Sequence, residues 1–206
     1  MSDAARRTVR ASARATTRAS ARATTRYVAL LRGMNVGGHR VSMDSLRTHF
    51  TALRLRNVET YIASGNVIFE SDDTTDRAAL EQRIEQHLEQ ALGYAVATFL
   101  RTPDELAAAV AAVPFPATEV DRPGYSLHVG FLRTTPDAAL AELLASRETV
   151  MDAFGTGARE LYWLCRGRST DSLVKWPALE RTARLEITMR NLKTVRTLAS
   201  KYGDAT

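Results

Sequence analysis

Cysteine is scarce in this sequence, because Cys165 is the single one among 206 residues. One thiol cannot close an intrachain disulfide or build a thiolate zinc site, and a chain without disulfides is typical of a reducing compartment. No apolar run approaches the roughly 20 residues needed to cross a bilayer, and the N-terminus lacks the apolar stretch of a secretory signal. We therefore expect a cytoplasmic protein without a membrane segment.

Familiar catalytic motifs are missing as well. The four histidines show no HExxH spacing, and neither GxxxxGK[ST] nor GxGxxG occurs. Ser172 and Lys175 match SxxK, but the SDN and KTG motifs that accompany it in penicillin-recognising enzymes are absent, so we interpret the match as chance. The sequence predicts no metal site and leaves open both the cofactor and whether the protein is an enzyme.

The formal net charge of +5 is concentrated in the first 26 residues. Seven arginines against the single acid Asp3 give this segment a charge of +6, so residues 27–206 sum to about −1. Its repeated ASARATTR units hold almost no large apolar side chain and cannot offset an ordering cost of roughly 1 to 2 kcal/mol per residue. We expect residues 1–26 to be a disordered, low-complexity tail, although an organelle transit peptide has a similar composition.

Residues 27–102 are predicted to form a βαββαβ unit. An apolar run at 27–33 predicts a strand, and Ser42 then offers an N-cap to a helix. The segment 58–70 predicts two strands folded over a Ser-Gly-Asn turn, since Gly and Asn tolerate positive φ. A second helix ending at Gly93 and a strand over 94–100 complete a ferredoxin-like pattern.

Residues 103–206 are predicted to form a second α+β subdomain. Apolar spacing predicts helices over 103–113, 136–145 and 175–183, a last helix opened by Thr188, and strands over 126–133, 148–154 and 160–165. No Gly/Ser-rich or Pro-rich linker separates the halves. The predicted fold is therefore α+β, a ferredoxin-like unit packed with a second α+β subdomain, with mostly antiparallel or mixed sheets.

The first candidate site is the loop LRGMNVGGHR after the first predicted strand. Glycine N–H groups between a strand and a helix N-terminus can converge on an anion that the helix dipole also favours. The alternative is that the glycines serve only the turn. The candidate ligand-binding residues here are Arg32, Asn35, Gly37, Gly38, His39 and Arg40, with Ser64 and Asn66 of the hairpin turn.

The second candidate site is the C-terminal segment, where Thr188 is predicted to cap a helix carrying Arg190 and Asn191 in its first turn. Arg168 and Ser169, on the polar loop after strand 160–165, join this set. An ordinary N-cap with solvated basic residues is the alternative. We expect the two sites to form one pocket for a phosphate-bearing or other anionic small molecule.

Two further function classes stay open. Nucleic-acid binding is expected only through the tail, because residues 27–206 are close to neutral and lack a basic stripe. A protein-interaction module without a ligand is the other class. The sequence does not determine the oligomeric state.

Three segments, YVALLRGMNVGGHRVSM, TYIASGNVIFES and TMRNLKTV, resemble the domain of unknown function 1697 family of bacterial proteins over about residues 27–202. The resemblance implies an α+β fold and a cytosolic bacterial setting, but no substrate, cofactor or catalytic residue. It coincides with both candidate sites. In the loop RSTDSL, either Ser169 or Ser172 is the counterpart of the serine common in the family.

Overall fold

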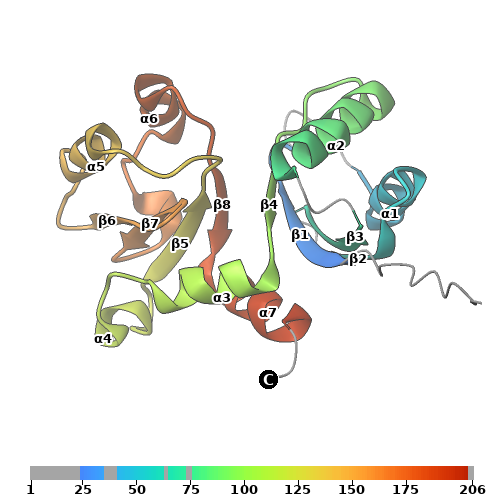
Figure 1. Cartoon of the computed structure of the whole chain (residues 1–206). Coiled ribbons are helices and arrows are strands. Elements are labelled where there is room, and N and C mark those ends of the chain that lie inside the picture. Colours follow the sequence, from blue (N-terminus) through green and yellow to red (C-terminus); the bar gives the residue numbers. More distant parts are fainter. Residues whose placement is uncertain (1–23, 35–40, 63–64, 73–75, 204–206) are drawn as a thin grey trace, which may run out of the picture.

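A computed structural model describes residues 24–34, 41–62, 65–72 and 76–203 of the chain. The first unit contains β1 (Thr25–Leu31), α1 (Met43–Ala52), β2 (Arg56–Tyr61), β3 (Asn66–Ser71), α2 (Arg77–Leu92) and β4 (Thr98–Arg101). Its strands form an antiparallel sheet in the order β2-β3-β1-β4 (Figure 1). This is the ferredoxin-like arrangement that the sequence predicts.

Local signals in the sequence set the helix ends of this unit. Ser42 caps α1, because its Oγ accepts a hydrogen bond from the backbone N–H of Ser45 at 3.0 Å. Gly93 ends α2 in the left-handed region at φ +80°, where a residue with a Cβ would be strained. β1 begins at Thr25, so Thr25 and Arg26 belong to the strand and not to the predicted tail.

The second unit repeats the pattern of the first. It contains β5 (Ser126–Phe131), α5 (Ala138–Ala145), β6 (Asp152–Thr156), β7 (Glu160–Cys165), a short 3₁₀ turn (Ser169–Asp171), α6 (Trp176–Ala183) and β8 (Thr188–Asn191). Its sheet is again antiparallel, in the equivalent order β6-β7-β5-β8. The predicted α+β fold is therefore confirmed, and the second subdomain is a second ferredoxin-like unit.

One element of the sequence prediction is wrong. Thr188 does not cap a helix, because residues Thr188–Asn191 pair with β5 as strand β8. The helix is α7 (Leu192–Tyr202), and Asn191 caps it by accepting a hydrogen bond from Lys193 N at 2.9 Å. A strand of four residues shows too little alternation to be recognised, and its pairing partner lies about 60 residues earlier in the chain.

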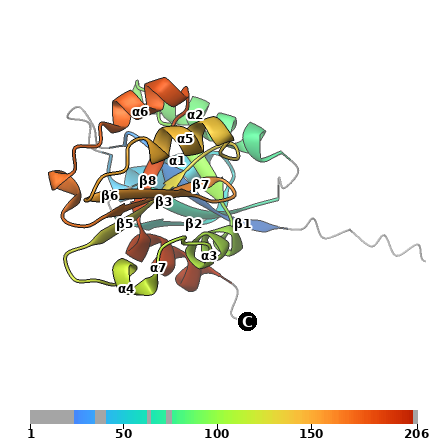
Figure 2. The same ribbon diagram turned by 90° about the vertical axis from the view of Figure 1, so that its left-hand side faces the viewer.

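The two sheets lie between two layers of helices (Figure 2). Helices α1 and α2 cover one face of the first sheet, and α5 and α6 cover the same side of the second sheet. The helices α3 (Pro103–Ala111), α4 (Ala117–Val120) and α7 lie on the opposite side. Under α3 and α7 the two sheets share one apolar core, to which both units contribute. Two separate cores lie beneath the helix pairs on the opposite side.

Candidate functional site

Strands β4 and β8 are edge strands, and each faces the other unit (Figure 1). From β8, the buried Arg190 reaches into the first unit, where Nη2 donates to the carbonyl oxygens of Leu31 at 2.8 Å and Gly65 at 3.2 Å. Its Nε donates to Asn66 Oδ1 at 2.6 Å, and Nη1 donates to Thr188 Oγ1 at 3.0 Å and to Met189 O at 2.9 Å. All five N–H donors of the guanidinium are thus used inside the protein.

Arg101 makes the reciprocal connection from β4 into the second unit. Its Nη2 donates to the carbonyl oxygens of Leu132 at 2.7 Å and Arg159 at 2.9 Å, and its Nε donates to Glu160 Oε1 at 3.0 Å. The strand registers show that the two arginines are equivalent, since Arg101 lies opposite Val28 of β1 and Arg190 opposite Val129 of β5. Each unit therefore anchors one arginine of the other.

The two arginines differ in the charge of their partners. Asn66 lies opposite Leu30 of β1, just as Glu160 lies opposite Phe131 of β5, so an amide and a carboxylate occupy equivalent positions. Every partner of Arg190 described above is uncharged. Burial lowers the pKa of Arg190 to about 10, so the side chain still carries its charge at neutral pH.

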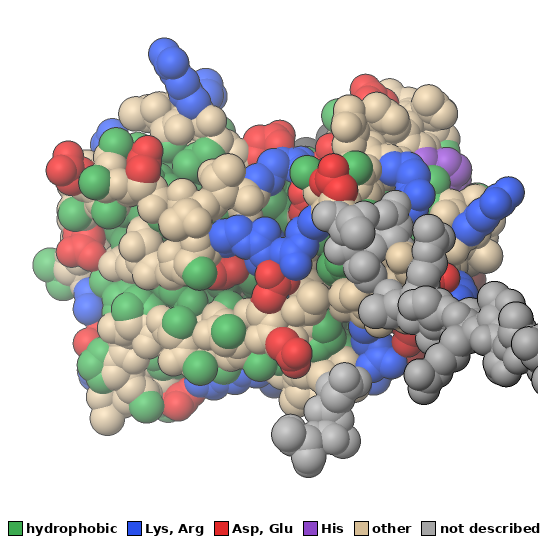
Figure 3. Space-filling view, viewed as in Figure 1, with side chains coloured by type: hydrophobic (Ala, Val, Ile, Leu, Met, Phe, Trp, Pro, Cys, Tyr) green, Lys and Arg blue, Asp and Glu red, His purple; other side chains and the backbone are tan. Residues whose placement is uncertain are grey.

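A cleft opens between the two units on the side away from α3 and α7, visible as a notch in the surface (Figure 3). Its volume is about 640 Å³, within the range of small-molecule sites. An adjoining hollow of about 370 Å³ shares Arg32, Arg133 and Glu186 with it and extends along α2 past Glu85 and Glu89. We call the two together the interunit cleft. The larger part is lined by Arg32, Leu132, Arg133, Thr134, Pro177, Glu180, Arg181, Arg184, Leu185 and Glu186.

Arg32 and Arg133 occupy equivalent positions in the cleft, because each directly follows the leucine that binds the arginine of the other unit. Arg32 pairs with Glu180 of α6 at 2.9 Å, and Arg133 pairs with Glu85 of α2. Burial lowers the pKa of Arg133, but the hydrogen bond to Glu85 and the surrounding carboxylates outweigh this effect, so the pKa is raised. Arg133 therefore remains cationic.

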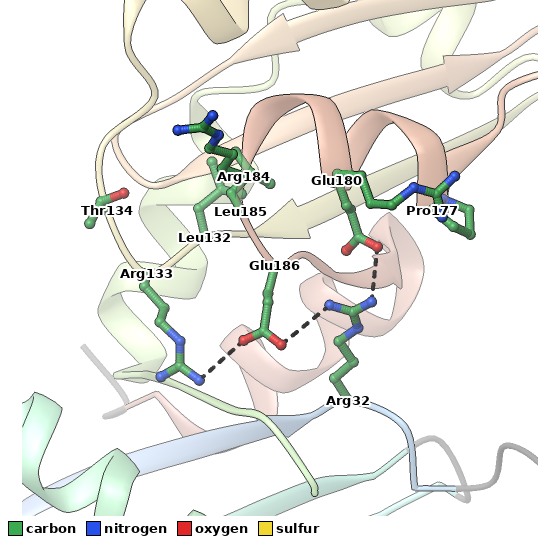
Figure 4. A pocket seen from close by; sticks show the side chains of 10 residues that line it. Arg32, Leu132, Arg133, Thr134, Pro177, Glu180, Arg184, Leu185 and Glu186 are labelled. Carbon is green, nitrogen blue, oxygen red and sulfur yellow. Dashed lines mark hydrogen bonds and ion pairs between the residues drawn. The ribbon is translucent and has the colours of Figure 1, made fainter.

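The carboxylate of Glu186 lies between these two guanidinium groups (Figure 4). Its Oε1 is 3.8 Å from Arg32 Nη1, and its Oε2 is 3.7 Å from Arg133 Nη2. Both distances exceed the 2.7 to 3.2 Å of a normal N–H···O hydrogen bond. The Glu186 side chain is 54% exposed, and neither Arg32 nor Arg133 forms a hydrogen bond with its carboxylate.

Two more arginines line the α6 side of the cleft. Arg181 and Arg184 are exposed, and within the part of the chain that the structure describes neither side chain forms an ion pair or a hydrogen bond. With Arg32 and Arg133 they give the larger part of the cleft four cations against the two anions Glu180 and Glu186. This part of the cleft is therefore electropositive.

The structure places the sequence-predicted site residues in different surroundings. Arg32 lines the cleft, whereas Asn66, Thr188 and Arg190 meet in the buried contact between the units. Exposed Asn191 caps α7. Asn35, Gly37, Gly38, His39, Arg40 and Ser64 lie outside the described residues.

Arg168 and Ser169 lie elsewhere. Arg168 pairs with Asp171 at 2.9 Å, and Ser169 begins the 3₁₀ turn that follows β7. The neighbouring Gly167 accepts a hydrogen bond from Ser126, at the end of β5 remote from Arg133. These two residues therefore do not take part in the interunit cleft.

Sequence reasoning missed Arg133, Glu186, Arg181 and Arg184. One signal was present for Arg133, because the sequence segments YVALLR and LHVGFLR, which run through the ends of β1 and β5, both finish on a Leu-Arg pair. The other three residues follow no motif. Among the described residues, no group of three or more His, Cys, Asp or Glu side chains is arranged to hold a metal ion. None of the helices among these residues combines the length and the apolar composition that a membrane span requires.

Comparison with known proteins supports the resemblance seen in the sequence. A family model described as "Protein of unknown function (DUF1697)" matches residues 24–162, more than half of the chain. Among solved structures, the chain is similar to the conserved bacterial protein SP0830 from Streptococcus pneumoniae, with 26% sequence identity and a TM-score of 0.67. That match covers 86% of this chain and 98% of the other. No match was found among curated proteins.

Proposed function

This chain belongs to the DUF1697 family, proteins of unknown function, and we propose from the geometry of the interunit cleft that it binds a small anionic molecule there. A phosphate or carboxylate group of the ligand is held between Arg32 and Arg133. One anchoring arginine comes from each unit, so the site exists only when both units are folded and packed.

The position of Glu186 is the observation that carries this proposal. A carboxylate already lies between the two guanidinium groups, but at 3.7 and 3.8 Å it is too far away for hydrogen bonds. A free phosphate or carboxylate can approach closer and accept paired N–H donors, which is the stronger arrangement. Glu186 thus acts as a weak internal competitor for the ligand.

The surplus of arginines supports the same conclusion. Arg181 and Arg184 attract an anion without first having to break an ion pair with another described residue. Because they are exposed, each contributes a modest amount to binding, and the anion depends mainly on Arg32 and Arg133.

Titration with inorganic phosphate, followed by amide chemical shifts in two-dimensional NMR, tests the proposal. We expect saturable shifts at Thr134 and Glu186, and weaker binding in Arg133→Ala and Arg181→Ala. Arg181→Ala is the cleaner variant, because that side chain supports no described contact. Arg147→Ala, an exposed arginine outside the cleft, is the matched control.

The variant Glu186→Gln should change the affinity for phosphate in the opposite direction. Removing the competing carboxylate should tighten phosphate binding several-fold, whereas a purely structural Glu186 would leave it unchanged. Shifts that do not saturate, or equal binding by Arg181→Ala, Glu186→Gln and the wild type, would exclude the proposed site.

A further inference from the structure

The two walls of the interunit cleft carry opposite charges. Each wall is the second helix of a βαββαβ unit, α6 on one side and α2 on the other, so the two are equivalent in the fold. Arg181 lies in the last turn of α6 and Arg184 caps its end. The last turn of α2 holds Glu89 and no basic residue. The repeated backbone therefore presents cations on one wall and an anion on the other.

Three glutamates follow one another at four-residue spacing on α2, which places them on one face of the helix. The first two are engaged. Glu81 accepts from the backbone N–H of Leu100 at 2.7 Å, and Glu85 accepts from that of Thr98 at 2.7 Å. Both also pair with Arg133. They tie α2 to β4 and are not available to a ligand.

Glu89, the third, is exposed and lines the cleft. Within the described part of the chain its carboxylate forms no ion pair or hydrogen bond. It also lies at the C-terminal end of α2, where the helix carbonyls carry a partial negative charge that favours a cation. The carboxylate and the helix end therefore both attract positive charge at this point.

We infer that the ligand of the interunit cleft is a zwitterionic small molecule. Its phosphate or carboxylate group lies between Arg32 and Arg133 on the side of Arg181 and Arg184, and its ammonium or guanidinium group lies against Glu89. The inference rests on the proposed function, since it assigns the second end of the same ligand. An anion without a cationic group would leave Glu89 unpaired.

Matched pairs of alkyl phosphates test this assignment. Each pair has the same chain, of two to six carbons, and one member carries a terminal primary amine. At the length that spans the cleft, we expect the amine to tighten binding about two- to fivefold, the effect of one exposed ion pair. Glu89→Gln should abolish this advantage, so that both members of the pair bind equally well. Glu142→Gln, an exposed acid on α5, is the control and should keep the advantage.

The outcomes separate the two proposals. If no phosphate binds, both the proposed function and this inference fail. If both members of every pair bind equally well, or if Glu89→Gln retains the preference for the amine, the anion site stands and the zwitterion assignment is overturned.

Discussion

Replacing Arg190 by methionine tests whether this buried arginine holds the two units together. Methionine fills a similar volume but donates no hydrogen bond. The variant therefore removes three bonds from β8 to Leu31, Gly65 and Asn66 of the first unit, and two bonds within β8. Arg190 as a whole residue is only 7% exposed, so water cannot readily replace the lost donors.

The expected loss of stability depends on which of the five acceptors keep another hydrogen-bond donor in the variant. Gly65 O still accepts from Leu31 N at 2.8 Å, and Leu31 O keeps a long contact of 3.4 Å from the Thr188 hydroxyl. About three acceptors then lose their main donor, at about 1 to 2 kcal/mol each. Because the variant also removes the desolvation cost of a buried charge, we expect the free energy of unfolding to fall by about 2 to 4 kcal/mol.

Urea unfolding followed by far-UV circular dichroism measures this loss. Arg184→Met is the control, since it removes an exposed arginine with no described partner and should change stability by less than about 0.5 kcal/mol. A loss below about 1 kcal/mol for Arg190→Met, with an unchanged dependence on urea, would refute the structural role. In that case Arg190 would again be a candidate for direct contact with the ligand.

Three other expectations concern stability. Gly130→Ala should cost about 1 to 3 kcal/mol in urea unfolding, because a Cβ there would lie within 3.0 Å of three core side chains. Burial lowers the pKa of His49 and His128 in the folded protein. As pH falls below about 6.5, the unfolded chain therefore binds more protons than the folded chain, and the free energy of unfolding should decrease. Replacing both histidines with glutamine should reduce this pH dependence. A chain containing only residues 24–206 should keep its melting temperature, whereas Arg26→Ala should lower it slightly by removing the contacts of that side chain with Glu70 and Tyr202.

The first unit could be predicted largely from local sequence. Ser42 and Gly93 set helix ends through their own backbone and side-chain chemistry, and Leu80, Ile84 and Leu88 lie at helical spacing on the buried face of α2. Two strand starts were less accurate: β4 and β6 begin at Thr98 and Asp152, four residues later than predicted. An apolar run does not mark the residue at which pairing with a distant strand begins.

The candidate site was much less predictable, because its residues are joined by contacts between the units. Arg32 was identified from the loop after β1, but its partners Glu180 and Glu186 lie about 150 residues later in the chain. Arg190 was expected to offer donors to an anion from a helix end. It instead lies in a strand, and its donors are bound by acceptors of the other unit and of β8 itself.

The sequence by itself determined the α+β class, the family resemblance and most helix boundaries, since caps, turns and apolar spacing act over a few residues. Only the tertiary structure decided that the second half repeats the first and that the arginines from the two units converge on Glu186. The physical reason is that strand pairing and ion pairs across a cleft join groups that are distant in the sequence. These groups come together only because both sheets pack on α3 and α7.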